Sequence, residues 1–155
     1  MPFTIFYYVP AAVLIFKLLS IIFFYFENKN IITNYKHSDS IEFKNINGKI
    51  ITENGLLKKK IQWCRFHILV NRNSIFIFPK HFYFIPDRTV NLIFSNADRK
   101  YTKKPYVLRK FNLINNSAEL IYYPNHIIGS RKIQLQNLTL EQLSVFQEIK
   151  KIKNY

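Results

Sequence analysis

Apolar residues fill the beginning of the chain almost without interruption, from Pro2 to Phe26, and Lys17 is the single charged residue among them. A helix of about 24 residues rises about 36 Å, which is enough to cross a hydrocarbon core of about 30 Å. Phenylalanine and tyrosine gather at both ends of the run, as aromatic residues do at the two interfaces of a bilayer. The pattern therefore predicts a transmembrane helix over residues 1–27.

Lys17 and Pro10 are the two residues that count against a full span. A lysine near the helix centre costs about 2.5–3.5 kcal/mol, whereas the Val, Leu, Ile and Phe residues together gain about 4–8 kcal/mol, so insertion is still favoured. Lys17 either extends its amine to the headgroups or contacts an acidic partner helix. If Pro10 delayed the helix start to Ala11, the shorter segment would favour a shallow or re-entrant insertion.

The charges that flank the apolar run predict its orientation. No lysine or arginine precedes the run, whereas Lys29, Lys36 and further lysines follow it. The positive-inside rule therefore places the N-terminus outside and the C-terminal part in the cytoplasm, with one crossing of the inner (cytoplasmic) membrane. A cleaved signal peptide fits less well, because the run lacks a basic start and a small-residue cleavage site.

Beyond a polar stretch at 28–40, which we interpret as a tether, the pattern changes to short apolar runs between turn residues. Asn47-Gly48 and Asn54-Gly55 each predict a tight hairpin, because these residues accept positive φ. From Ile61 to Val70, alternating positions share one face, which is the period of a strand. About seven antiparallel strands in meander order are expected, and with a final helix they form one domain over 41–155.

A helix over 139–153 is expected to close this domain. Apolar residues recur every three positions along it and form one stripe that must be buried. Thr139 is a good N-cap, and Gln142, three residues later, can complete a capping box. Acidic Glu141 near the start and lysines near the end match the helix dipole. The expected fold class is therefore mainly β with one C-terminal α-helix, preceded by a transmembrane helix.

This order of elements resembles bacterial membrane-anchored proteins that carry a PH-like or GRAM-like domain after an N-terminal transmembrane stretch. The segments behind the resemblance are FYYVPAAVLIFKLLSIIFFYF, WCRFHILVNRNSIFIFP and KIQLQNLTLEQLSVFQEIKKI. The resemblance implies a PH-like antiparallel β-barrel or sandwich. In PH-like domains that bind lipid, a basic loop between the early strands commonly meets the headgroup. By resemblance, that role falls on Lys58, Lys59 and Lys60.

The sequence offers no catalytic or metal-binding pattern, and we expect neither an enzyme nor a cofactor. The four histidines share no metal-ligand spacing, and a single cysteine, Cys64, excludes a multi-cysteine zinc site. Cys64 lies in an apolar strand register, where a buried, inert thiol is the expected state. The acidic residues are scattered, and no Gly-rich phosphate loop or nucleophile motif occurs.

The formal net charge of +14 is the main remaining clue to a partner. Lys58–Lys60 form the densest basic run, and Arg65 lies on the same strand face as Trp63. A domain tethered near an anionic leaflet gains about 1 kcal/mol for each basic residue close to the surface. The joint enrichment in Lys, Ile, Asn, Phe and Tyr also fits an AT-rich genome, which would give such a charge without selection. The anchor and the lack of an RNA-binding aromatic motif argue against nucleic acid.

Two functional hypotheses follow. In the first, the chain is a single-pass, membrane-anchored, non-catalytic cytoplasmic binding module that contacts a protein partner or an anionic lipid surface through Lys58, Lys59, Lys60 and Arg65. In the second, it is a subunit or immunity-type interaction protein of a membrane complex, recognised through its transmembrane helix with Lys17 as the partner contact. The sequence leaves the ligand, the partner and the oligomeric state open.

Overall fold

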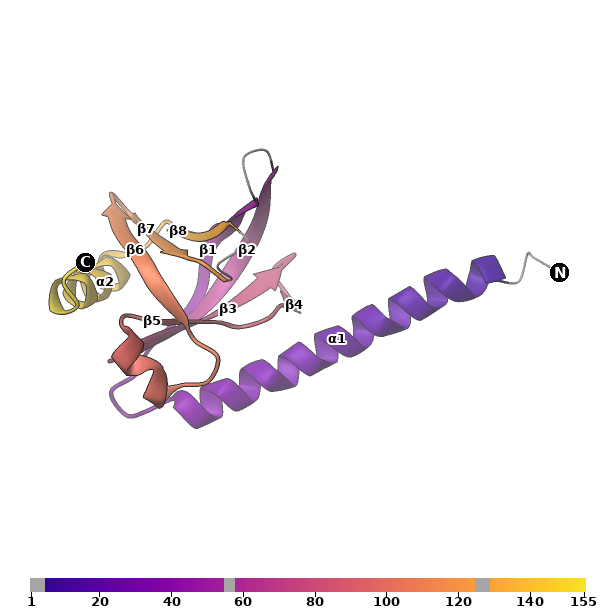
Figure 1. The fold of residues 1–155 in the computed structure, drawn as a ribbon, viewed down its shortest axis with the longest axis horizontal. Helices are drawn as coiled ribbons and strands as arrows, with labels where there is room; N and C mark the ends of the chain where they lie inside the picture. The colour runs from indigo at the N-terminus through magenta and orange to yellow at the C-terminus, as the bar shows by residue number, and fades with distance from the viewer. Residues whose placement is uncertain (1–4, 55–57, 125–128) are drawn as a thin grey trace.

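The structure, a computed structural model, describes residues 5–54, 58–124 and 129–155. A long N-terminal helix projects from a small β domain, and a short C-terminal helix covers the far end of that domain (Figure 1). The elements are α1 (Ile5–Tyr35), β1 (Ile41–Asn54), β2 (Lys58–Asn71), β3 (Ser74–His81), β4 (Ile85–Pro86), β5 (Val90–Ile93), η1 (Asn96–Tyr101), β6 (Tyr106–Ile114), β7 (Ser117–Tyr122), β8 (Ser130–Gln136) and α2 (Leu140–Ile152).

Seven of the described strands close into a barrel. The sheet order is β2-β1-β8-β7-β6-β5-β3-β4, and β2 also pairs with β3, so that only β4 stays outside the closed ring. The predicted fold class, mainly β with a C-terminal helix after an apolar N-terminal helix, is confirmed. One pairing departs from the expected antiparallel pattern, because β5 and β6 run parallel. The η1 turn lies between these two strands and returns the chain before β6 begins.

The two Asn-Gly pairs of the first strand region have different outcomes. Asn47-Gly48 is not a turn, and the predicted hairpin there is wrong, since β1 continues through both residues and pairs with β2 and β8. Gly48 is needed for close packing instead, because a Cβ there would collide with the carbonyl oxygen of Gln134. β1 and β2 pair up to Asn54 opposite Lys58, so the chain reverses where predicted, and residues 55–57 lie outside the described residues.

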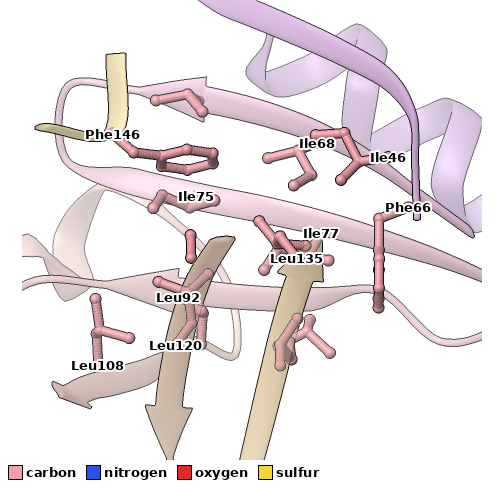
Figure 2. Close-up of a cluster of buried hydrophobic side chains, with 14 of the residues drawn as sticks. Ile46, Phe66, Ile68, Ile75, Ile77, Leu92, Leu108, Leu120, Leu135 and Phe146 are labelled. Atoms are coloured by element: carbon pink, nitrogen blue, oxygen red, sulfur yellow. The ribbon is translucent and has the colours of Figure 1, made fainter. Parts of the chain in front are cut away.

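The barrel interior is filled by alternating side chains of the seven barrel strands and is closed at one end by α2. Figure 2 shows Phe146 of α2 at one end of a cluster that contains Ile68, Ile75 and Leu135. The predicted cap of α2 is confirmed, since the Thr139 hydroxyl accepts from the Gln142 amide and the Gln142 side chain accepts from the Thr139 amide. Burial of these apolar side chains is the main source of barrel stability.

The end of α1 departs from the sequence-based interpretation of residues 28–40 as a tether. The helix does not end at residue 27 but continues without a break to Tyr35. Ile31, Ile32 and Tyr35 pack on a second apolar cluster, formed by outward-facing residues of β2 and β3. β3 is therefore buried on both faces along most of its length. The apolar outer face of the barrel therefore stabilises residues 28–35 as a helix, although the many polar residues in this stretch had indicated a tether.

The N-terminal part of α1 extends away from the barrel (Figure 1). Pro10 lies inside the helix and does not shift its start to Ala11. The segment Tyr8–Tyr35 has a mean hydropathy of 2.2 in its most apolar window, and none of that window is buried. By length and composition, α1 is able to cross a membrane.

Candidate membrane-facing site

The junction of α1 with the barrel fixes how the domain is held relative to the apolar helix. The Thr89 hydroxyl donates to the Asn28 side-chain oxygen, and the Asn28 amide donates to the backbone oxygen of Asp87 at 3.4 Å. At the C-terminal end of α1, the Asn71 side chain donates a hydrogen bond to the backbone oxygen of Tyr35 at 2.8 Å. Polar contacts at both ends and apolar packing between them thus hold residues 28–35 on the barrel.

α1 and β3 run side by side in opposite directions. The Tyr35 and Phe76 rings lie 4.9 Å apart, and Asn28 contacts Asp87, whose amide donates to the Pro79 oxygen at 3.0 Å. The seven helical residues between these contacts span about 10 Å, and the three strand residues from Phe76 to Pro79 also span about 10 Å. Continuing along β3 therefore leads toward the apolar part of α1.

Three exposed aromatic residues occupy the turn that follows β3. Phe82, Tyr83 and Phe84, here called the aromatic tip, are 76%, 67% and 74% exposed. Phe82 and Tyr83 have φ values of 47° and 72°, a left-handed conformation that costs energy for bulky residues. The tip directly follows His81, at the end of β3 that leads toward the apolar part of α1.

The predicted basic residues lie on the β1–β2 hairpin. The pairing of β2 with β3 begins at Arg65 opposite Lys80, so Lys59 and Lys60 lie beyond the end of β3, and both are exposed. Lys59 lies 3.9 Å from the Glu53 carboxylate. Lys58 belongs to the strand by its backbone, and its side chain lies outside the described residues.

Arg65 and Lys17 have different surroundings from these lysines. The Arg65 guanidinium lies 4.5 Å from the centre of the Tyr83 ring, a cation–π contact that braces the aromatic tip. Trp63, two residues earlier on the same face of β2, is exposed and lies 5.3 Å from the Lys49 amine. Lys17 is exposed on α1, about 16 Å of helix before Asn28. The structure brings Arg65 to the tip and leaves Lys17 apart.

A cleft of about 410 Å³ separates α1 from the barrel beside this junction, and we call it the α1 cleft. Its lining combines aromatic, amide and basic side chains, which are contributed by α1, β3, β5, β6 and the segments that precede β5 and β6. The lining residues are Phe23, Phe26, Glu27, Asn30, Ile31, Asn34, Tyr35, Phe76, Arg88, Thr89, Asn91, Lys103, Lys104 and Tyr106. Of these, Arg88, Lys103 and Lys104 contribute to the net charge of +14, and no sequence pattern singles them out as a site.

Two oxygen atoms of the α1 cleft are buried without a hydrogen-bond partner among the described residues, Glu27 Oε2 and Asn91 Oδ1. The Asn91 amide nitrogen donates to the Thr102 hydroxyl and to the backbone oxygen of Lys103. The Asn91 amide nitrogen is therefore satisfied, and only Oδ1 lacks a hydrogen-bond donor among the described residues. Sequence reasoning missed both residues, and the only available signal was that Glu27 is the first charge after the apolar run.

A second hollow of about 260 Å³ lies at the barrel end next to Phe24 of α1. Tyr122 lines it and is fully buried, and its hydroxyl has no hydrogen-bond partner among the described residues. Burial raises the pKa of Tyr122, while the charge of nearby Arg131 acts in the opposite direction. The hydroxyl therefore stays neutral at physiological pH and is able to donate one hydrogen bond.

Cys64, His81 and Asp87 form a chain of polar contacts that the sequence did not reveal. Cys64 Sγ lies 3.4 Å from His81 Nδ1, and His81 Nε2 lies 2.8 Å from Asp87 Oδ2. This is the order of groups found in cysteine nucleophile sites. Burial and the Asp87 charge raise the pKa of Cys64 to about 12, and the residue is only 7% exposed. The thiol is thus protonated and shielded, which favours a structural role.

His67 is tied into an ionic cluster rather than free to bind a ligand. His67 Nε2 lies 2.8 Å from Glu42, which also pairs with Lys36 and with Lys44 at 3.2 Å. Burial lowers the pKa of His67, and the Glu42 charge opposes this shift. Within the described ranges, no group of three or more His, Cys, Asp or Glu residues is placed to hold a metal ion.

Comparison with known proteins adds no family to this geometry. No family model and no curated protein matches the chain. The resemblance to PH-like and GRAM-like domains therefore stays a prediction.

Proposed function

We propose that this protein is a single-pass, membrane-anchored, non-catalytic binding module whose barrel lies against the anionic cytoplasmic surface of the inner membrane. The observation that supports this most is the docking of residues 28–35 on β2 and β3. A tethered domain could face any direction, whereas a docked helix holds one end of the barrel toward the bilayer.

The end that faces the bilayer under this proposal has the chemistry of a membrane contact. The aromatic tip offers three exposed rings at the end of β3, and phenylalanine and tyrosine favour the bilayer interface. Lys59 and Lys60 are exposed on the β1–β2 hairpin of the same barrel, and each basic residue near an anionic surface contributes about 1 kcal/mol. Exposed aromatics without this placement would instead be an aggregation liability.

Trp63 makes the proposal testable, because it is the only tryptophan of the chain and lies close to the tip. We would reconstitute the full-length protein in vesicles that contain lipids brominated at defined depths and measure quenching of Trp63 fluorescence. Quenching by shallow bromines is expected, and it should increase with anionic lipid and weaken at high salt. Equal, weak quenching by all lipids at every salt concentration would refute the proposal.

Matched variants separate tip contact from general proximity. Replacing Phe82, Tyr83 and Phe84 with serine is expected to reduce quenching of Trp63, because it removes the rings that hold the barrel end at the interface. Leu140→Ser is the control, since Leu140 is 85% exposed but lies on α2 at the opposite end of the barrel (Figure 1). An equal effect of the two changes would contradict a specific tip contact.

A further inference from the structure

The α1 cleft contains two buried acceptors that lack donors. Asn91 and Glu27 both line the cleft. Asn91 is 6% exposed, and its Oδ1 and Glu27 Oε2 are buried without a hydrogen-bond partner among the described residues. A buried oxygen without a hydrogen bond is costly, more so when it belongs to a carboxylate. Their presence in one cleft points to a bound group that donates hydrogen bonds and that carries positive charge.

The same cleft presents positive charge at its rim. Arg88, Lys103 and Lys104 line it and are exposed, and none of them forms an ion pair with the part of the chain that the structure describes. Arginine and lysine side chains in this arrangement suit a phosphate. The ligand therefore combines an anionic phosphate with a cationic donor.

The position of the cleft identifies where such a ligand comes from. Phe23 and Phe26, near the end of the apolar run, line one side, and Glu27 is the first charged residue after that run. The cleft thus begins where α1 would leave the hydrocarbon core and enter the headgroup region. A volume of about 410 Å³ lies within the range of small-molecule sites, about 300–1,000 Å³.

We propose that the α1 cleft binds one phospholipid whose headgroup carries a primary ammonium, as phosphoethanolamine does. Arg88, Lys103 and Lys104 hold the phosphate. The ammonium donates to Glu27 Oε2 and Asn91 Oδ1, and the acyl chains follow the phenylalanines of α1 into the bilayer. This assignment deepens the proposed function and rests on α1 crossing the membrane.

Closely related lipids leave part of the cleft unsatisfied. A quaternary ammonium, as in phosphatidylcholine, carries charge but has no N–H to donate to the two acceptors. A glycerol headgroup, as in phosphatidylglycerol, donates hydrogen bonds but leaves the Glu27 carboxylate without a counter-charge. Preference for the ethanolamine lipid over both is therefore the signature of this site.

The test uses the full-length protein in a neutral detergent and native mass spectrometry with three lipids that have identical acyl chains. We expect phosphatidylethanolamine to bind about tenfold more tightly than phosphatidylcholine or phosphatidylglycerol, the factor that corresponds to one hydrogen bond to a charged group. Equal binding of the three lipids, or tighter binding of either competitor, would overturn the proposal.

Variants assign the preference to the named side chains. Glu27→Gln keeps the size of the side chain and removes its charge, so the preference over phosphatidylcholine should fall several-fold. Lys103→Gln with Lys104→Gln should weaken all three lipids alike, whereas Lys151→Gln on α2 is the control and should change nothing. A Glu27→Gln protein that keeps the full preference would show that the site is elsewhere.

Failure of this inference is distinguishable from failure of the proposed function. Trp63 quenching reports contact of the barrel end with the bilayer and does not depend on Glu27. Quenching that persists while the three lipids bind equally would reject the cleft assignment and retain membrane apposition. A lipid preference without Trp63 quenching would retain the cleft and reject apposition.

Discussion

The packing of α1 on the barrel includes one large aromatic side chain, Tyr35, and its truncation gives the sharpest stability prediction. Tyr35 is half-buried, and its ring lies 4.9 Å from that of Phe76. Tyr35→Ala keeps the backbone oxygen that accepts from Asn71 and removes only the ring. The variant therefore isolates the apolar part of the docking.

The free energy of docking that Tyr35→Ala removes follows from the burial of the ring. Truncating a fully buried large aromatic residue to alanine costs about 3–5 kcal/mol, so a half-buried ring with one aromatic partner is worth about 2–3 kcal/mol. The interior cluster of the barrel contains no α1 residue. We therefore expect the helix to undock more often while the barrel stays folded.

Amide hydrogen exchange on the full-length protein in nanodiscs measures this undocking directly. Amides of residues 28–35 should exchange about 30- to 150-fold faster in Tyr35→Ala, because each 1.4 kcal/mol is a factor of ten. The amides of Ile75 and Ile77 in β3, whose side chains belong to the interior cluster, should change little. Thr33→Ala is the control, since Thr33 is exposed on the same helix turn. Equal exchange of residues 28–35 in both variants would refute the reasoning.

Three further outcomes follow from individual side chains. A hydrogen bond from Lys36 lowers the pKa of Glu42 to about 2, although burial opposes this shift. The stabilisation from this cluster is therefore present above the ordinary pKa near 4.5 and is lost as the pH falls toward 2. The free energy of unfolding should fall less steeply with acid in Glu42→Gln than in the unchanged protein, and identical acid profiles would contradict the ionic role. Burial and the Asp87 charge raise the pKa of Cys64 to about 12, so alkylation at pH 8 should be far slower in the folded protein than in denaturant, and a fast native reaction would reverse the structural interpretation. Lys17→Leu should remain in carbonate-washed membranes, since it removes an insertion cost of about 2.5–3.5 kcal/mol; recovery in the soluble fraction would count against insertion of α1.

The elements with a strong local signal were predictable from the sequence. The apolar stripe and the Thr139 cap fix α2 by local rules, but only its middle, Leu143, Phe146 and Ile149, is packed on the core. Leu140 and Ile152, at its ends, are exposed. The reversal at Asn115-Asn116 likewise follows from residues that accept positive φ, and Asn115 has a φ of 51°. The mainly β fold with its closing helix could therefore be derived without tertiary information.

The features that sequence reasoning missed all depend on contacts between distant residues. Residues 28–35 contain only a few apolar side chains, and their helix is stabilised by the outer face of β3, which no local pattern reveals. Asn47-Gly48 has turn chemistry, but the glycine serves close packing against β8. The α1 cleft joins Glu27 to Asn91 across more than sixty positions of chain, so its two unpartnered oxygens emerge only from the fold.

Under the proposed function, α1 and the barrel form one unit whose tip end meets the bilayer. Paramagnetic relaxation enhancement in nanodiscs measures this placement, with one gadolinium chelate attached to the lipid headgroups and a second one free in solution. We expect the lipid-bound chelate to broaden amides 82–84 strongly and α2 weakly, and the free chelate to do the opposite. Similar broadening of the tip and of α2 by the lipid-bound chelate would contradict it.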